Sequence, residues 1–381
     1  MRVIIFAHSL RSDWNHGNAH FLRGIATELI ARGHEVIGYE PADGWSASNL
    51  VQDHGESALE RFRVVYPSLV CRTYLPATID LDEVLDKADV VLVHEWNSHD
   101  MVARIGAHRV RNRGYVLLFH DTHHRSVTLP ADMAAYDLEH YDGVLAYGAA
   151  VRDVYVRRGW ASSAFVWHEA ADTRVFHPIA SDSFDGDVVW IGNWGDDERS
   201  AEIEEFLIEP IASLGLRASV HGVRYPDVAR ARLQDAGITY RGWLPNHEVP
   251  NVFARFRATV HVPRRPYVQA LRGVPTIRVF EALACGVPLV SAPWIDAEHL
   301  FTPGEDFLMA ADGETTRAHL RAVVADIDLA TSLVDTGLRT IRARHTCAHR
   351  VDELFGIVDR LRGVPTLAAS DQRAPMTSTV T

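Results

Sequence analysis

The sequence predicts an α/β protein with two doubly wound domains that face each other across a cleft. Short valine, isoleucine and leucine runs alternate with helix-spaced segments, which is typical of parallel sheets covered by helices on both faces. The pattern stops at a polar stretch and then starts again, and a length of 381 residues suits two domains better than one. We therefore expect domains at residues 1–171 and 188–345, joined by a linker at 172–187.

The first domain begins with a buried strand, Val3–Ala7, whose apolar run is too short for a signal peptide. A polar loop, His8–Asn18, comes next, before a helix that carries apolar residues on one face and stops at Gly33. Further strands are expected at Glu35–Tyr39, Val90–His94, Val116–His120 and Gly143–Tyr147. Ligands of open parallel sheets bind at the carboxyl ends of the strands, so the loops that follow them are the places to search.

The second domain repeats this pattern. It opens with a strand, Val188–Ile191, the loop Gly192–Gly195 and a helix through about Leu214. Its further strands are expected at Ser219–His221, Thr239–Arg241, Thr259–Val262 and Pro288–Ser291. Helices fill the region from Thr315, the last of them at residues 346–362, and the aperiodic residues 363–381 are expected to be a disordered tail.

The charge and cysteine content exclude several classes of protein. A formal net charge of −12 disfavours a nucleic-acid partner or a polybasic membrane anchor, because either needs a positive face. No run approaches the roughly 20 apolar residues of a transmembrane segment. The three cysteines, Cys71, Cys285 and Cys347, are far apart and form no C-x-x-C, as expected in a reducing, cytoplasmic compartment. The oligomeric state is not indicated.

One helix carries a candidate ligand-binding carboxylate. It bears Arg278 and Glu281, ends at Gly286, and precedes a strand directly. Its apolar residues keep helical spacing, so one face packs on a sheet, with Glu281 at the edge of that face. A carboxylate there can accept hydrogen bonds from vicinal hydroxyls such as those of a ribose. The alternative is an ordinary solvated glutamate.

Two loop segments and a set of aromatic and histidine residues are candidates for contact with a ligand. His16, Gly17 and Asn18 precede a helix N-terminus, where free N–H groups favour an anion or a hydroxyl-rich molecule; the alternative is a plain N-cap by Asn18. His120 and Asp121 end a strand and are candidates for binding substrate hydroxyls or stabilising charge; the alternative is a local turn. Aromatic and histidine residues of the first domain suggest a sugar-like or aromatic acceptor: Trp14, Trp96, His16 and His99.

The second domain supplies candidates for binding a diphosphate. Gly192 and Asn193 allow close approach of a phosphate, and Arg199 follows within the first helical turn. Arg264 and Arg265, after a strand, add positive charge at the same end of the sheet. Each arginine alone is more often a surface residue, but together they are consistent with a diphosphate clamp.

Metal and nicotinamide chemistry are disfavoured. His123 and His124 point apart in an extended chain, and the histidines around Glu95 miss the H-E-x-x-H spacing. Asp185-Gly-Asp187 has a D-x-D pattern, but its place before a strand indicates a turn. No G-x-G-x-x-G fingerprint follows the first strand, which argues against a nicotinamide oxidoreductase.

Residues 1 to about 361 resemble a GT-B glycosyltransferase of the group 1, family-four-like type, in its spore-maturation-type branch. The segment Ile277–Pro293 resembles the Glu-Ala-x-Ala-x-Gly-x-Pro signature, and His168–Pro178 resembles the motif that ends the first domain. Gly192–Arg199 resembles the opening of the second domain, and His16–Asn18 and His120-Asp121 are weaker similarities.

The resemblance implies a mode of action. Two Rossmann-like domains would close over a nucleotide sugar, with the C-terminal helix crossing back to the first domain. It implies donor binding by Gly192, Asn193, Arg199, Arg265, Arg278 and Glu281, acceptor binding by the first domain through His16, Gly17 and Asn18, and catalytic roles for His120, Asp121 and Arg199. It also implies a hexosyltransferase-like enzyme without a bound metal or cofactor that retains anomeric configuration.

One departure from the family pattern bears on the sugar. The family places a second glutamate at the position of Gly273, so the sugar-contacting end differs here. Two other functions remain open, namely a GT-B-shaped sugar-nucleotide epimerase and a catalytically silent module that binds a nucleotide sugar or a partner.

Overall fold

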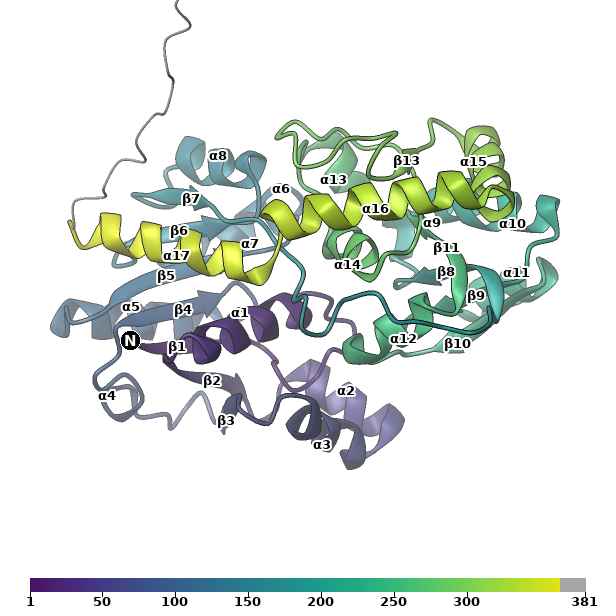
Figure 1. Cartoon of the computed structure of the whole chain (residues 1–381). Helices are drawn as coiled ribbons and strands as arrows, with labels where there is room; N and C mark the ends of the chain where they lie inside the picture. Colours follow the sequence, from purple (N-terminus) through teal and green to yellow (C-terminus); the bar gives the residue numbers. More distant parts are fainter. Residues whose placement is uncertain (364–381) are drawn as a thin grey trace, which may run out of the picture.

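The computed structural model describes residues 1–363 and shows two α/β domains side by side, each built on a parallel sheet with helices on both faces (Figure 1). This confirms the predicted fold class. Of the predicted tail, only Gly363 is among the described residues.

The first domain contains a seven-stranded parallel sheet in the order β3-β2-β1-β4-β5-β6-β7. Its strands are β1 (Arg2–Phe6), β2 (Glu35–Pro41), β3 (Val70–Tyr74), β4 (Val90–His94), β5 (Val116–Asp121), β6 (Gly143–Ala146) and β7 (Ala164–Val166). Its helices are α1 (Ala19–Ala31), α2 (Trp45–His54), α3 (Glu56–Val65), α4 (Leu81–Val84), α5 (His99–Arg111), α6 (Arg125–Thr128), α7 (Pro130–Ala134) and α8 (Ala149–Arg158). The central strands β1, β4 and β5 are almost entirely buried, because helices cover both faces of the sheet.

The second domain contains a six-stranded parallel sheet in the order β10-β9-β8-β11-β12-β13. Its strands are β8 (Gly186–Ile191), β9 (Ala218–His221), β10 (Ile238–Gly242), β11 (Phe256–His261), β12 (Leu289–Ser291) and β13 (Leu308–Met309). Its helices are α9 (Ser200–Ile203), α10 (Glu209–Leu214), α11 (Asp227–Asp235), α12 (Val249–Phe253), α13 (Arg265–Gln269), α14 (Ile277–Cys285), α15 (Gly313–Ala325) and α16 (Ile327–Arg344). Short 3-10 turns at Asp196–Glu198 and Asn246–Glu248 and a π-helical turn at Glu204–Ile208 complete it.

Three strands were not expected from the sequence, namely β3, β7 and β13. All three lie at sheet edges and are only partly covered; β7 and β13 are also very short, with three and two residues, and β3 is interrupted by polar residues. The predicted turn at Asp185-Gly-Asp187 is wrong for its last two residues, since β8 already begins at Gly186. There Asp187 accepts a hydrogen bond from the backbone N–H of Arg217 at 2.9 Å, which binds the strand end to the neighbouring chain segment.

The chain crosses between the domains twice. After β7 it runs through residues 172–185 into β8, and after α16 it returns to the first domain as α17 (Cys347–Leu361), which packs against α1 (Figure 1). The two crossings touch, because Ala171 and Thr346 form a β-bridge. The indole N–H of Trp167 donates to the carbonyl of Arg350 at 2.8 Å, which ties α17 to the first domain.

A glycine in α1 permits this close approach. A methyl group at Gly24 would lie 2.5 Å from Sγ of Cys347 and 2.7 Å from Cβ of Asp172. We expect Gly24→Ala to lower the free energy of unfolding by about 1–3 kcal/mol, because both crossings would have to move. Gly356→Ala is the matched control, since within residues 1–363 no neighbouring atom lies within 4 Å of a Cβ at that position on α17. It should raise stability by up to about 1 kcal/mol through helix propensity. Urea unfolding measures both, and equal effects would contradict the packing argument.

Candidate active site

A cavity of about 900 Å³ lies between the two domains, which is within the range of small-molecule sites. It is lined by loops that follow the carboxyl ends of strands in both sheets. Polar contacts join the two domains beside the cavity. Asp13 of the first domain accepts hydrogen bonds from the indole N–H of Trp243 and the backbone N–H of Asn246 in the second domain, both at 3.1 Å. The same carboxylate pairs with Arg23 of its own domain. The cavity therefore belongs to a closed arrangement of the domains.

One end of the cavity is positively charged, because Arg199, Arg264 and Arg278 all line it. Arg264 pairs with Glu198, and Arg278 pairs with Glu281. Within residues 1–363 Arg199 has no carboxylate partner, and its guanidinium donates to the carbonyls of Val262, at 3.0 Å, and Asn193. Burial, and then the neighbouring Arg264, lower the pKa of Arg199 to about 9, so the group is still positive at neutral pH. An uncompensated cation in a cavity wall is a site for an anion.

The loop before Arg199 fixes the position of its side chain. Gly195 has φ +84°, and a Cβ there would lie 2.5 Å from Nε of Arg199, so the arginine folds over the glycine. The guanidinium carbon lies 5.1 Å from the ring centre of Trp190, a cation–π contact. The carbonyl of Gly192 accepts hydrogen bonds from the Trp190 indole at 3.1 Å and the Tyr225 hydroxyl at 2.8 Å. The charge is therefore held in place before any ligand binds.

The structure brings four of the six predicted donor residues into the cavity wall: Gly192, Asn193, Arg199 and Arg278. Arg265 lies outside the wall, with its side chain 43% exposed and its Nε 2.9 Å from Glu202, and its donor contact stays a prediction. Arg264 lines the cavity instead. Helix α13 begins at Arg265, and consecutive residues of a helix point in directions about 100° apart.

Glu281 is fully buried and does not line the cavity, in contrast to the exposed edge position expected from the sequence. Its carboxylate pairs with Arg278 on the same helix and lies 2.9 Å from Nδ1 of His20 in the first domain. His20 accepts the backbone N–H of Asp172 at Nε2, so its Nδ1 is the donor to Glu281. In this arrangement Glu281 connects the two domains; its contact with a ribose stays a prediction.

His120 and Asp121 lie beneath the cavity and not in its wall, with exposed fractions of 1% and 0%. Neither side chain lines the cavity in this arrangement, and their catalytic roles stay a prediction. Asp121 accepts hydrogen bonds from the Tyr155 hydroxyl at 2.8 Å and from the backbone N–H of His123 at 3.0 Å. Burial lowers the pKa of His120 to about 3, so its ring is neutral. Both residues end a fully buried strand, and they shape the loop that follows it.

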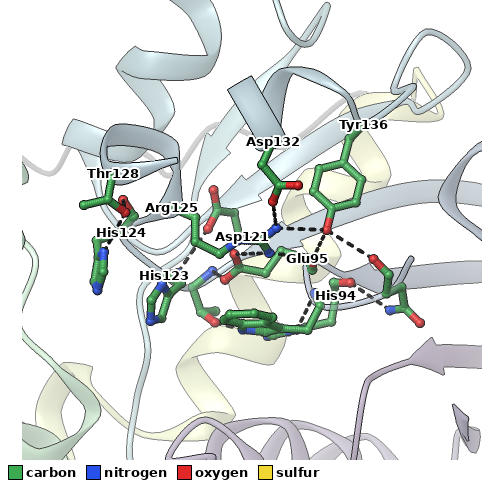
Figure 2. A network of polar contacts seen from close by, with 12 residues as sticks. His94, Glu95, Asp121, His123, His124, Arg125, Thr128, Asp132 and Tyr136 are labelled. Carbon is green, nitrogen blue, oxygen red and sulfur yellow. Dashed lines mark hydrogen bonds and ion pairs between the residues drawn. The ribbon is translucent and has the colours of Figure 1, made fainter. Parts of the chain in front are cut away.

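That loop contributes His123 and His124 to the cavity wall. Their ring centres are 4.0 Å apart, so the expectation that they point apart is wrong, because the chain turns into α6 here and is not extended. The loop is anchored by Arg125, which binds Glu95, Asp132 and Tyr136 (Figure 2). Burial lowers the pKa of His124 to about 4.

The first-domain wall contains the predicted residues His16, Gly17 and Asn18. Asn18 does not cap α1 with its side chain; it donates to Thr122 instead. His16 packs on His8, with ring centres 3.9 Å apart, and the wall continues with the indoles of Trp14, Trp45 and Trp96. His99 does not line the cavity, with Nε2 2.9 Å from the carbonyl of Asp132, and its acceptor role stays a prediction.

Several lining residues were missed by the sequence analysis. Tyr147 directly follows β6, and His221 and His261 are the last residues of β9 and β11. Each stands at a strand's carboxyl end, a signal that would have found them. Glu169 also lines the cavity, but it follows β7, a strand that was not predicted.

Comparisons with known proteins agree with this architecture. Residues 199–356 match a family model described as Glycosyl transferase-like. Sucrose-phosphate synthase from Thermosynechococcus elongatus superposes with a TM-score of 0.62 at 14% identity, covering 96% of this chain and 100% of that one. HepE from Anabaena, in complex with UDP and glucose, gives 0.65 at 14% identity over 94% and 99% of the two chains. An α-glucosyltransferase in complex with UDP and a 13-mer DNA gives 0.68 at 13% over 94% and 99%. No curated protein matches the chain in sequence.

These similarities concern the fold of the whole chain and the sequence of its C-terminal half. The chain has the fold of GT-B glycosyltransferases, and its C-terminal half contains a glycosyl transferase-like domain, as the resemblance predicted. The spore-maturation-type branch stays a prediction. In the part of the chain that the structure describes, no helix is both long and apolar enough to cross a membrane.

Proposed function

We propose that this protein transfers a sugar from a nucleoside diphosphate sugar to a small acceptor. The observation that carries the proposal is Arg199, a rigidly held cation that has no carboxylate partner among the described residues and lies near Arg264 and Arg278 in the wall of the interdomain cavity. A diphosphate is the anion that such a cluster fits. The similar structures of HepE and the α-glucosyltransferase contain UDP, which supports a uridine nucleotide as the first donor to test.

The chemistry follows from where charge develops. When the bond between the sugar and the diphosphate breaks, negative charge moves onto the leaving phosphate, and fixed arginines stabilise it there. The closed domains keep out water that would otherwise hydrolyse the sugar. In this proposal the arginines provide the positive charge at the leaving group, so transfer requires no metal. Retention of anomeric configuration is part of the proposal through the family resemblance.

The acceptor is proposed to bind against the first domain. Trp14, Trp45 and Trp96 offer flat apolar faces next to the histidines of the same wall, a combination suited to a sugar ring or an aromatic molecule. One structural neighbour is bound to DNA. The formal charge of −12 here disfavours a polyanion, so we propose a small-molecule acceptor.

A thermal-shift panel of UDP, GDP, dTDP, ADP and CDP and their common sugars, with and without Mg²⁺, tests the proposal. A nucleotide that binds the native state raises the melting temperature by mass action. We expect UDP or one of its sugars to give the largest shift and the shift to persist in EDTA. No shift with any nucleotide would overturn the proposed function.

A second candidate is a module that binds a nucleotide sugar without turnover. The burial of His120 and Asp121 favours it, because of the three candidates for catalysis only Arg199 lines the cavity. Nucleotide binding without release of UDP from UDP-glucose, across a panel of sugar and aromatic acceptors, would support this module over the transferase.

A further inference from the structure

Glu169 is an unusual residue in the cavity wall. It is 2% exposed, it lines the cavity, and within the described residues its Oε1 has no hydrogen-bond partner. A buried carboxyl oxygen without a partner is unfavourable by about 1–3 kcal/mol, so such an atom calls for an explanation. A ligand group that completes the hydrogen bond supplies one.

The other acidic residues of the wall are already occupied. Asp13 binds Arg23 and the second-domain N–H groups, and Glu198 binds Arg264 and lies 3.3 Å from His124. Glu169 pairs with no cation in the part of the chain that the structure describes. It is therefore the carboxyl group of this wall that is available to a ligand.

On the second-domain side, neither position 273 nor Glu298 provides another carboxyl group to this part of the cavity. Gly273 has φ +94°, and a Cβ there would lie 3.2 Å from Cγ of Glu298 and 3.3 Å from Cβ of Ala297, so this position does not suit a side chain. Glu298 itself accepts the backbone N–H of Ala149 at 2.8 Å and lies 2.9 Å from Nε2 of His168. The carboxyl group that reaches the cavity next to α14 comes from the first domain.

We propose that Glu169 holds the sugar of the donor, through hydrogen bonds between its carboxyl group and a sugar hydroxyl. The placement carries this assignment: Glu169 shares the wall with Ile277 and Arg278, at the start of α14, and Arg278 belongs to the cluster assigned to the diphosphate. A sugar attached to that diphosphate extends into the same part of the cavity. This inference rests on the proposed function and names the residue that recognises the sugar.

The ionisation of Glu169 agrees with this role. Burial, and then the negative charge of Glu281, raise the pKa of Glu169 well above its usual range, although the N–H of Ile277 and the charge of Arg278 oppose the shift. A neutral carboxyl group both donates and accepts, which matches a hydroxyl group. It also avoids repulsion from the diphosphate.

Two substitutions separate this role from others. Glu169→Met keeps the length of the side chain and removes its hydrogen bonds, whereas Glu169→Gln keeps a neutral donor and acceptor. Calorimetry with UDP-glucose and with UDP gives the ratio of the two affinities for each variant. We expect Glu169→Met to lower the affinity for UDP-glucose by about tenfold relative to the affinity for UDP, as for one lost hydrogen bond to a buried group. In Glu169→Gln the ratio of the two affinities should stay within about threefold of the wild-type ratio. Glu298→Gln, outside the wall, should leave the ratio unchanged.

The outcomes have different meanings. An unchanged ratio in folded Glu169→Met would overturn the inference, and an equal loss for UDP and UDP-glucose would move the contact to the diphosphate and overturn it as well. A Gln variant as weak as Met would show that the negative charge is required, which contradicts a neutral carboxyl group. If the folded wild type binds neither these probes nor any other nucleotide of the thermal-shift panel, the proposed function itself fails.

Discussion

Arg199→Ala is expected to slow release of UDP from UDP-glucose at least tenfold and to weaken UDP binding by about 10- to 100-fold. The reason is that a hydrogen bond from a charged group to an anion in a water-poor site contributes about 1.5–3 kcal/mol. Arg199 has no carboxylate partner among the described residues, so its charge is available to the ligand. Calorimetric titration with UDP and a coupled assay of UDP release measure the two effects.

Arg265→Ala is the control for this experiment. Arg265 is a neighbouring arginine of the same domain, but it contacts Glu202 and does not line the cavity. We expect its removal to change UDP affinity by less than about threefold. Equal losses in the two variants would indicate a general effect of net charge and would contradict a specific anion site at Arg199.

Glu281→Ala is expected to lower the free energy of unfolding by about 3 kcal/mol, because it removes one member of a buried ion pair. The Glu281 side chain is 0% exposed, and its loss leaves Arg278 without its partner and the Nδ1 of His20 without an acceptor. Because Glu281 belongs to the second domain and His20 to the first, the substitution also removes a contact between the domains. Urea unfolding followed by tryptophan fluorescence measures it.

Glu314→Ala tests whether this loss depends on burial. Glu314 also pairs with an arginine one helical turn away, Arg317, but its side chain is 84% exposed on α15. Exposed pairs contribute little, so we expect a change below about 1 kcal/mol. If Glu281→Ala were as mild as this control, Glu281 would not be the interdomain link that the structure indicates.

The fold was predictable from the sequence because the central strands are long apolar runs. Val90–His94 matches β4 at both ends, since each of its residues is buried and the run is continuous. The edge strands β3 and β7 were not predicted, because each is only partly covered, β3 contains polar residues, and β7 is only three residues long. The break of the helix after Gly195 into 3-10, α and π turns depends on packing that local sequence does not encode.

The site was predictable in its location more than in its contacts. Strand-end reasoning located the cavity and its residues Gly192, Asn193 and Arg199 correctly. It could not predict that Arg264, and not Arg265, faces the cavity, because this depends on where α13 begins. It also could not predict that Glu281 would meet His20, 261 positions earlier in the chain, since that contact depends on how the domains dock.

The structure of the protein bound to UDP tests the central claim most directly. We expect the diphosphate to contact the guanidinium of Arg199 at the end of the cavity formed with Arg264 and Arg278. UDP bound elsewhere on the molecule, or bound here with its phosphates away from Arg199, would contradict the assignment of this cavity as the donor site.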